Sequence, residues 1–408
     1  MSSRTSYDSN RTASSGDSAR SNPFSLFRRT TTKSLYMKEM LKAPEATESL
    51  GTELQSLEIQ RRKGLDFAAF SPTAGFAAVA AGRKLKIFSW DRKADLRWTC
   101  CWAGTMLREC VKASERMVAI ALSDSLVVVA AEDGFEVYEL STDEIETSEE
   151  KKPVMQVMGL SDLRAIALPP KTPKISGWIC AGTGNGRLLI WGIRRGGGGE
   201  PQKELSLKGY NGTTLDIPSA MAFNHDGSRV CVGSRNRHIY IYELGGDGSS
   251  PPKLIELKGD FGTGTSRFIR FTAIAFLSEN SIAITTDSRF PAGCPSVFDI
   301  ERKTRIAFGG ENETLDAQSL AVSPSEKRLV FVDSYRHRVI LVKGSPQGRF
   351  NSGIAVKTRV TDLKHGSNLF IAALAFTHLK LEDGNIDEQE KILVMDRMGT
   401  IQLFSCNE

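Results

Sequence analysis

The chain has 408 residues, of which 40% are hydrophobic and 25% are charged. This length exceeds the roughly 250–300 residues at which a single core stops growing, so it predicts two or three domains or a repeat architecture. The net charge of +5 is too small over this length to indicate nucleic-acid binding by itself. No stretch approaches 18 uninterrupted apolar residues and no apolar signal core opens the chain, so we expect a protein that is neither transmembrane nor secreted.

Residues 1–50 are predicted to form a disordered tail, because residues 1–35 contain ten Ser, five Thr and almost no large apolar residue before Phe24. Arg28 and Arg29 precede three hydroxyl residues at the spacing that basophilic kinases favour, and phosphate there would reverse the local charge. The candidate phosphorylation sites are Thr30, Thr31 and Thr32. A mitochondrial transit peptide is an alternative interpretation of this Arg- and Ser-rich segment, although it shows no amphipathic helical period.

The seven cysteines are odd in number and include no C-x-x-C pair. Zinc ligation and a disulfide framework are therefore unsupported, and we expect a reducing compartment, the cytoplasm or the nucleus.

The rest of the chain repeats one unit seven times, about every 50 residues. Each unit begins with an Ala before an apolar or aromatic residue. These alanines are Ala69, Ala121, Ala167, Ala222, Ala275, Ala321 and Ala375. A second strand, a tight turn and a third strand follow each anchor, and a more polar fourth strand follows in the first six units. Four strands in each of seven units predict an all-β, seven-bladed β-propeller, in which small residues suit the crowded innermost strands.

The seventh unit ends with its third strand at Phe404 and lacks a fourth. Residues 53–59 alternate like the other outer strands, so we expect them to complete the last blade and close the ring. The predicted domains are a tail at 1–50 and one propeller at 51–408. The other expected outer strands are 96–101, 153–157, 203–207, 253–257, 304–308 and 354–358.

The repeat resembles a degenerate WD40 propeller, and the best-matching unit runs from Ala222 to Leu244. Trp191 stands where the family has its Trp. The family's Gly-His pair is missing from the outer-to-inner turns, and Trp-Asp occurs only at Trp90-Asp91, slightly out of register. Two sequence markers accompany the family's buried His–Asp–Ser hydrogen-bond network. Of these, the Gly-His pair is missing from the outer-to-inner turns and Trp-Asp occurs only once.

No catalytic motif stands out in the sequence. None of the five histidines pairs with a candidate nucleophile, and no P-loop or G-x-S-x-G is present. The glycine-rich segment 182–186 predicts a hairpin turn rather than a phosphate loop. A solvated loop is expected for Glu382, Asp383, Asp387, Glu388 and Glu390, whose spacing does not fit calcium. We expect no enzyme activity, cofactor or metal.

Basic residues gather in the turns between the second and third strands, which in a propeller lie on one face. They are Arg83, Lys84, Arg187, Arg235, Arg237, Arg289, Arg336, Arg338 and Arg397. One interpretation is that exposed turns carry charges that pair locally with acids. The other is a basic face that receives an acidic or phosphorylated segment, which Arg can bind bidentately. Tyr335 and Trp191 would then add apolar contacts.

The leading functional hypothesis is a non-catalytic scaffold that binds protein partners through a propeller face, as a monomeric ring within a larger complex and without nucleic acid. The first alternative is phosphoinositide binding on a membrane surface, as in a propeller family with a Phe-Arg-Arg-Gly motif. The only near match is Phe27-Arg28-Arg29-Thr30, in the tail. The second alternative is an enzyme with its active site in the central channel, but the inner strands offer no convergent His, Asp or Glu.

Overall fold

The computed structural model of the chain places strands and loops in most of the region after residue 54. It describes residues 55–56, 66–92, 97–106, 117–140, 152–170, 177–193, 200–208, 215–236, 238–244, 271–286, 295–302, 304–307, 317–323, 325, 328–333, 338–343, 358–362, 371–381, 383–397 and 399–406. The predicted tail, its threonines Thr30, Thr31 and Thr32, and the near match at 27–30 lie outside these ranges.

The described strands form seven antiparallel sheets, which we call blades. Blade 1 contains β2 (Phe67–Phe70), β3 (Phe76–Ala81), β4 (Lys84–Trp90) and β5 (Trp98–Thr105). Blade 2 contains β6 (Met117–Leu122), β7 (Leu126–Ala131), β8 (Gly134–Glu139) and β9 (Met155–Met158). Blade 3 contains β10 (Leu163–Ala167), β11 (Trp178–Thr183), β12 (Arg187–Gly192) and β13 (Lys203–Ser206). Blade 4 contains β14 (Pro218–Phe223), β15 (Arg229–Ser234) and β16 (Ile239–Glu243).

The remaining blades follow the same order from the inner to the outer strand. Blade 5 contains β17 (Phe271–Ser278), β18 (Ser281–Thr286), β19 (Ser296–Asp299) and β20 (Thr304–Ala307). Blade 6 contains β21 (Ala317–Val322), β22 (Arg328–Asp333), β23 (Arg338–Lys343) and β24 (Thr358–Asp362). Blade 7 contains β25 (Ile371–Lys380), β26 (Ile386–Asp396), β27 (Thr400–Ser405) and, as its outer strand, β1 (Gln55–Ser56).

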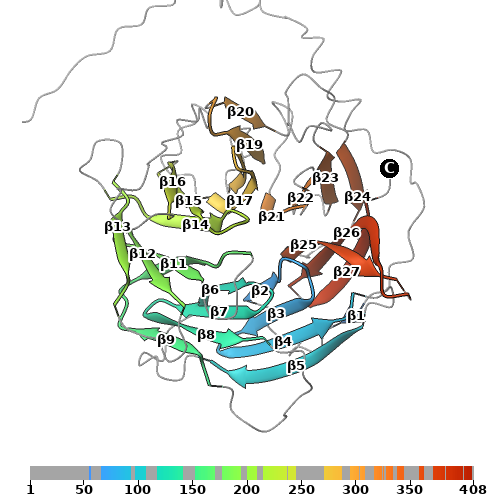
Figure 1. The fold of residues 1–408 in the computed structure, drawn as a ribbon, viewed down its shortest axis with the longest axis horizontal. Coiled ribbons are helices and arrows are strands. Elements are labelled where there is room, and N and C mark those ends of the chain that lie inside the picture. Colours follow the sequence, from blue (N-terminus) through green and yellow to red (C-terminus); the bar gives the residue numbers. More distant parts are fainter. Residues whose placement is uncertain are drawn as a thin grey trace, which may run out of the picture.

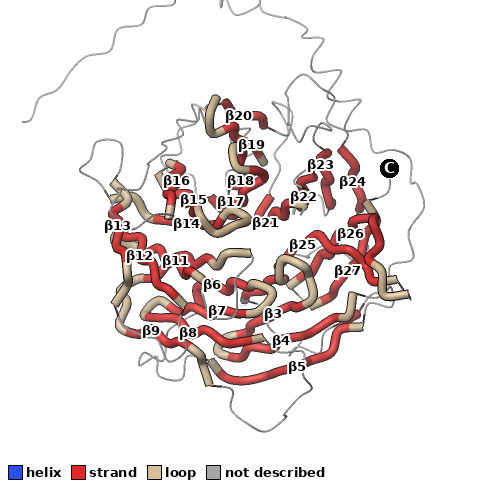
Figure 2. Tube along the Cα trace, viewed as in Figure 1, coloured by secondary structure: helices blue, strands red, loops and turns tan. Residues whose placement is uncertain are grey.

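The blades surround a common centre, and the innermost strand of each contacts those of its two neighbours. These contacts run in a closed cycle from β2 through β6, β10, β14, β17, β21 and β25 back to β2. Figure 1 shows the labelled inner strands nearest to this centre, and Figure 2 shows that the described chain consists of strands and loops. The all-β propeller fold expected from the repeat is therefore confirmed.

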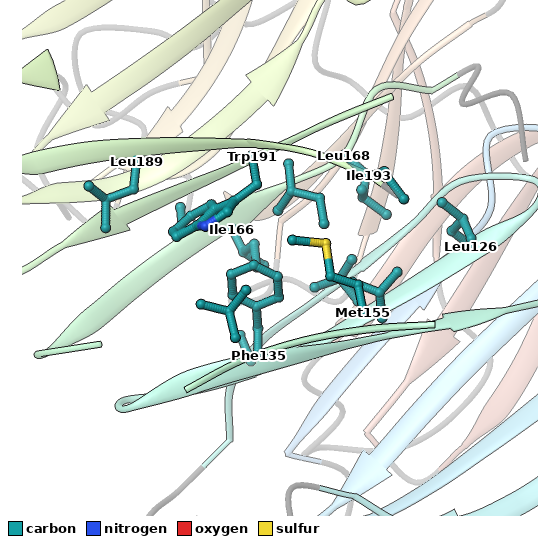
Figure 3. Close-up of a cluster of buried hydrophobic side chains, with 14 of the residues drawn as sticks. Leu126, Phe135, Met155, Ile166, Leu168, Leu189, Trp191 and Ile193 are labelled. Carbon is teal, nitrogen blue, oxygen red and sulfur yellow. The ribbon is translucent and has the colours of Figure 1, made fainter. Parts of the chain in front are cut away.

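The ring is held together by apolar side chains packed between neighbouring blades. Seven clusters of buried residues occupy the seven junctions of the described blades. Figure 3 shows the cluster between blades 2 and 3, where the ring of Phe135 meets that of Trp191 edge-on at 5.1 Å between centroids. Trp191 is only 2% exposed. Its expected role as a contact on the binding face is therefore wrong, because the indole packs in this core.

The outer strand of blade 6 is β24, at Thr358–Asp362. Of the expected outer strand 354–358, only Thr358 lies within the described residues. One further expectation differs from the structure. The acidic segment of the last unit is not simply a loop, because Asp387, Glu388 and Glu390 lie in β26. Glu390 is 4% exposed and forms an ion pair with Arg328 of blade 6 at 3.1 Å.

The domain division at residue 50 stays a prediction. Within the expected closing segment 53–59, only Gln55 and Ser56 are described, and they pair with Ile401 and Thr400 of β27. The expected outer strand of blade 4, 253–257, lies outside the described residues.

Candidate functional site

We call the face that carries the turns between second and third strands the upper face. Five residues of the predicted basic set have described side chains on it: Arg83, Lys84, Arg187, Arg235 and Arg397. Lys84, Arg187 and Arg397 are exposed, whereas Arg83 and Arg235 are half-buried. They come from blades 1, 3, 4 and 7, so the structure distributes the set around the ring.

Other members of the predicted set cannot be placed in this way. Arg338 is the first residue of β23 and pairs with Asp333 in the register, but its side chain is outside the description. Outside the described residues altogether lie Arg237, Arg289, Arg336 and Tyr335.

Acidic side chains accompany some of the basic turns. Arg187 pairs with Glu204 of the adjacent outer strand at 3.2 Å, and both side chains are about half exposed. Arg164, at the start of blade 3, pairs with Asp162 and lies 3.9 Å from Glu132 of blade 2. Local pairing of this kind is what the first interpretation of the charged turns predicts.

The turns of blades 3 and 4 are held close together by backbone hydrogen bonds to the segment between them. Leu207 N donates to Gly186 O at 2.8 Å, and Asp216 N donates to Leu207 O at 2.9 Å. On the other side, Arg235 N donates to Ile217 O at 2.8 Å. The segment 215–217 is thereby fixed between the turn that precedes Arg187 and the turn that contains Arg235.

Leu215 is an exposed apolar residue in this region, with a relative exposure of 51%. It forms an isolated β-bridge with Lys208, whose side chain is also exposed. The turn beside it requires glycine. Gly186 has a φ of 74°, and a Cβ there would lie 2.6 Å from Leu215 Cβ. We call Arg187, Lys208, Leu215, Arg235 and His238 the blade 3–4 patch.

Beneath the patch lies a buried carboxylate, Asp216, which accepts hydrogen bonds from side chains of blade 4. Ser234 Oγ lies 3.2 Å and His238 Nδ1 lies 2.5 Å from Asp216 Oδ2. The Tyr240 hydroxyl donates to the same oxygen, and the Asn236 amide donates to Oδ1. Ser234 Oγ also accepts from the backbone amides of Asn236 and His238, so the network fixes the turn that follows β15.

The network determines the charge of Asp216. Burial acts to raise the pKa of this carboxyl, but the hydrogen bonds from Tyr240, His238 and Asn236 outweigh burial and hold the pKa below its ordinary value. Asp216 is therefore an anion whose charge is directed inward at blade 4. Of the patch residues, it contacts His238.

Sequence reasoning found Arg187 and Arg235 but missed Lys208, Leu215 and Asp216. The available signal was the polar alternation of Ser234, His238 and Tyr240 at the end of one strand and the start of the next. That pattern indicates a buried acceptor, but it does not say that the acceptor is a residue in the connection from blade 3.

No group of three or more His, Cys, Asp or Glu side chains within the described residues could hold a metal ion. Burial raises the pKa of the Cys180 and Cys231 thiols well above the ordinary value, and it raises that of Cys406 to about 11. These thiols are protonated and enclosed in the blades, so they are poor nucleophiles.

The closed cycle of seven antiparallel blades, six with four described strands and blade 4 with three, is the fold of a WD40-like β-propeller. A chain in the crystal structure of the mitotic checkpoint complex is similar to this one, with a TM-score of 0.55 and 13% sequence identity. The similarity covers 90% of this chain and 98% of that chain. No protein-family model matches the sequence, and no curated protein matches it. Within the described ranges, no helix has the length and apolar character needed to cross a membrane.

Proposed function

We propose that this propeller is a non-catalytic protein-interaction scaffold that receives an acidic or phosphorylated peptide on the blade 3–4 patch. The observation that carries the proposal is the exposed Leu215, bordered by Lys208 and by the basic turns of blades 3 and 4. An exposed apolar residue beside Lys208 and between two basic turns fits a peptide that combines one apolar side chain with a carboxylate or phosphate. The neighbouring structure in the checkpoint complex supports a protein partner only through the shared fold.

The charges around Leu215 favour an anionic ligand. Among the described residues, Lys208 is exposed and forms no ion pair, and Arg235 is half-buried. The pair between Arg187 and Glu204 is half exposed, so it contributes only about 0–1 kcal/mol and a phosphate could replace the carboxylate. Guanidinium groups bind phosphate through paired hydrogen bonds, which supports Arg187 and Arg235 as the principal contacts.

The remaining basic turns and the tail extend this proposal. The upper-face residues Arg83, Lys84 and Arg397 would add to the field that attracts an acidic partner. Phosphorylation of the tail threonines and residence in the cytoplasm or nucleus stay predictions.

The test uses degenerate peptide pools that carry phosphothreonine, glutamate or unmodified threonine at a fixed position. Binding is measured by fluorescence polarisation with the full chain and with Lys208→Ala and Arg235→Ala. Hydrogen bonds to charged groups are worth about 1.5–3 kcal/mol, so each variant should bind the phosphorylated pool at least about tenfold more weakly. The matched control is Arg302→Ala, in the turn between β19 and β20 on the opposite face, and its affinity should equal that of the wild type.

Equal affinity for all three pools, or equal affinity of the patch variants and the wild type, would refute the proposal. A flotation assay with vesicles containing phosphoinositide tests the alternative partner. Flotation that depends on Lys208 and Arg235, without peptide binding, would assign the patch to a membrane surface instead.

A further inference from the structure

The outer strand of blade 1, β5 (Trp98–Thr105), differs from the other outer strands of the described blades. It has eight residues, with the sequence WTCCWAGT, and none of them is charged. The strands β9, β13 and β20 have four residues each, β24 has five and β1 has two. Of these, β13, β20 and β24 carry charged residues, while the uncharged β9 is half as long as β5.

An edge of this kind is normally protected. Proteins prevent strand edges from pairing with other chains by keeping them short or by placing charges, especially Lys, or Pro on them. The strand β5 is long, uncharged and free of Pro. A bulge at Cys101 interrupts its register with β4, and Trp102–Thr105 continue in regular register. Within the described residues β5 pairs with β4 on one side and with no strand on the other.

The hydrogen bonds of blade 1 show which backbone groups face outward. Met106 N donates to Arg83 O at 2.9 Å. Because hydrogen bonding alternates along an antiparallel pair, residues 83, 85 and 87 direct their amide and carbonyl groups toward β5. Trp90 N donates to Gly75 O, which directs the other set of β4 residues to β3. In the register Lys86 lies opposite Ala103 and Lys84 lies opposite Thr105, so the amide and carbonyl groups of Ala103 and Thr105 point away from the sheet.

The side chains on this edge leave room for a neighbouring strand. Ala103 and Thr105 are exposed, and both are small. The bulky Trp102 side chain folds over the strand, since a Cβ added at Gly104 would lie 2.5 Å from the Trp102 ring. Trp102 also packs against Tyr138 of blade 2, with ring centroids 5.5 Å apart. The large aromatic group is thus turned toward the next blade rather than across the free edge.

We propose that β5 of one chain pairs antiparallel with β5 of a second copy, so that the protein forms a two-fold symmetric dimer through a sheet continuous across both blades. Identical strands paired in this way give an isologous interface, which closes at two subunits and does not polymerise. Like charges opposite each other destabilise strand pairs, and an uncharged strand meets itself without that cost. A two-fold axis near Ala103 also keeps the preceding Arg97 of each copy at opposite ends of the paired segment.

The first test measures the molar mass of the full chain by light scattering across a micromolar to hundred-micromolar range. The wild type should approach twice the mass of one chain. Ala103→Pro removes an outward amide, and Ala103→Lys places like charges together at the axis, so each variant should remain at the mass of one chain. The matched control is Ser206→Lys, at an exposed position of the outer strand β13, and it should dimerise like the wild type.

The second test needs no variant that could disturb folding. Hydrogen exchange of the wild-type chain is followed for peptides that cover β5 and β13 at low and high protein concentration. Protection of the amides of Ala103 and Thr105 should rise with concentration, whereas that of β13 should not change. A wild-type mass of one chain at all concentrations overturns the proposal. A dimer that survives both Ala103 substitutions, or that leaves β5 exchange unchanged, overturns it as well.

Discussion

Replacement of Asp216 by Ala removes the common acceptor of four side-chain donors beneath the blade 3–4 patch. The donors are Ser234 Oγ at 3.2 Å, His238 Nδ1 at 2.5 Å, the Tyr240 hydroxyl and the Asn236 amide. A buried donor left without an acceptor costs about 1–3 kcal/mol. Half-buried donors recover part of that cost from water, so we expect the free energy of unfolding to fall by about 3–5 kcal/mol in total.

A smaller perturbation separates the hydrogen bonds from the packing. Tyr240→Phe keeps the ring, which stacks on Tyr242, and removes only the hydroxyl donor. Since hydrogen bonds to charged groups contribute about 1.5–3 kcal/mol, we expect a loss in that range. Combining Tyr240→Phe with Asp216→Ala should cost less than the sum of the two losses, because both changes remove the same interaction.

The stabilisation should depend on pH in a defined direction. The pKa of Asp216 is lowered in the folded protein, so the ionised carboxylate stabilises the fold at pH values above its unfolded pKa of about 3.9. That contribution is lost as the pH falls through the lower folded pKa. The difference in unfolding free energy between the wild type and Asp216→Ala should therefore shrink in acid.

The assay is urea unfolding followed by tryptophan fluorescence, at neutral pH and at pH about 3. The control is Asp383→Ala, because the Asp383 carboxylate is exposed and its hydrogen bonds stay within the turn before β26. That variant should lose far less stability than Asp216→Ala at neutral pH. Equal losses in the two variants, or a loss for Asp216→Ala that is the same at both pH values, would refute the role assigned to the network.

Two further substitutions test the packing between blades. Phe135→Ala opens a cavity beside the ring of Trp191. It should lower the free energy of unfolding by about 3–5 kcal/mol and shift the emission of Trp191 to longer wavelength. An unchanged thermal midpoint and spectrum would contradict the packing described. Arg328→Ala removes the guanidinium that pairs with the buried Glu390 carboxylate, and it should lower the free energy of unfolding by about 3 kcal/mol. Adding Glu390→Gln to this variant removes the buried charge and should restore part of the lost stability. A double variant as unstable as Arg328→Ala alone would show that the charge is not the cause.

Much of the fold can be predicted from the sequence, because the residues that mark each repeat are selected by local packing and local backbone conformation. The Ala before each anchor lies in a crowded inner strand, and the turn at Asn185-Gly186 needs a positive φ that glycine provides. Both features are visible in a few consecutive residues. The order of strands within a blade then follows from the chain order.

The candidate site is harder to predict because its parts come from different blades. Leu215 and Asp216 lie in a connection without strand periodicity, and their role depends on the turns at Gly186 and Arg235 that border it. Trp191 illustrates the opposite error. A tryptophan near a basic turn is typical of a binding face, but the alternation along β12 directs its side chain into the core between blades 2 and 3.

The pairing of β1 with β27 also constrains the order in which the ring can form during synthesis. Each of the first six blades is made of consecutive strands and can assemble soon after it leaves the ribosome. The seventh blade joins Gln55 to Ile401, which is translated much later. Bringing these distant residues together requires the loss of the loop's conformational freedom, so we expect closure to be a late and slow association. Before closure, the apolar residues of blades 1 and 7 lack their partners across this junction, and exposed apolar surface of this kind promotes aggregation.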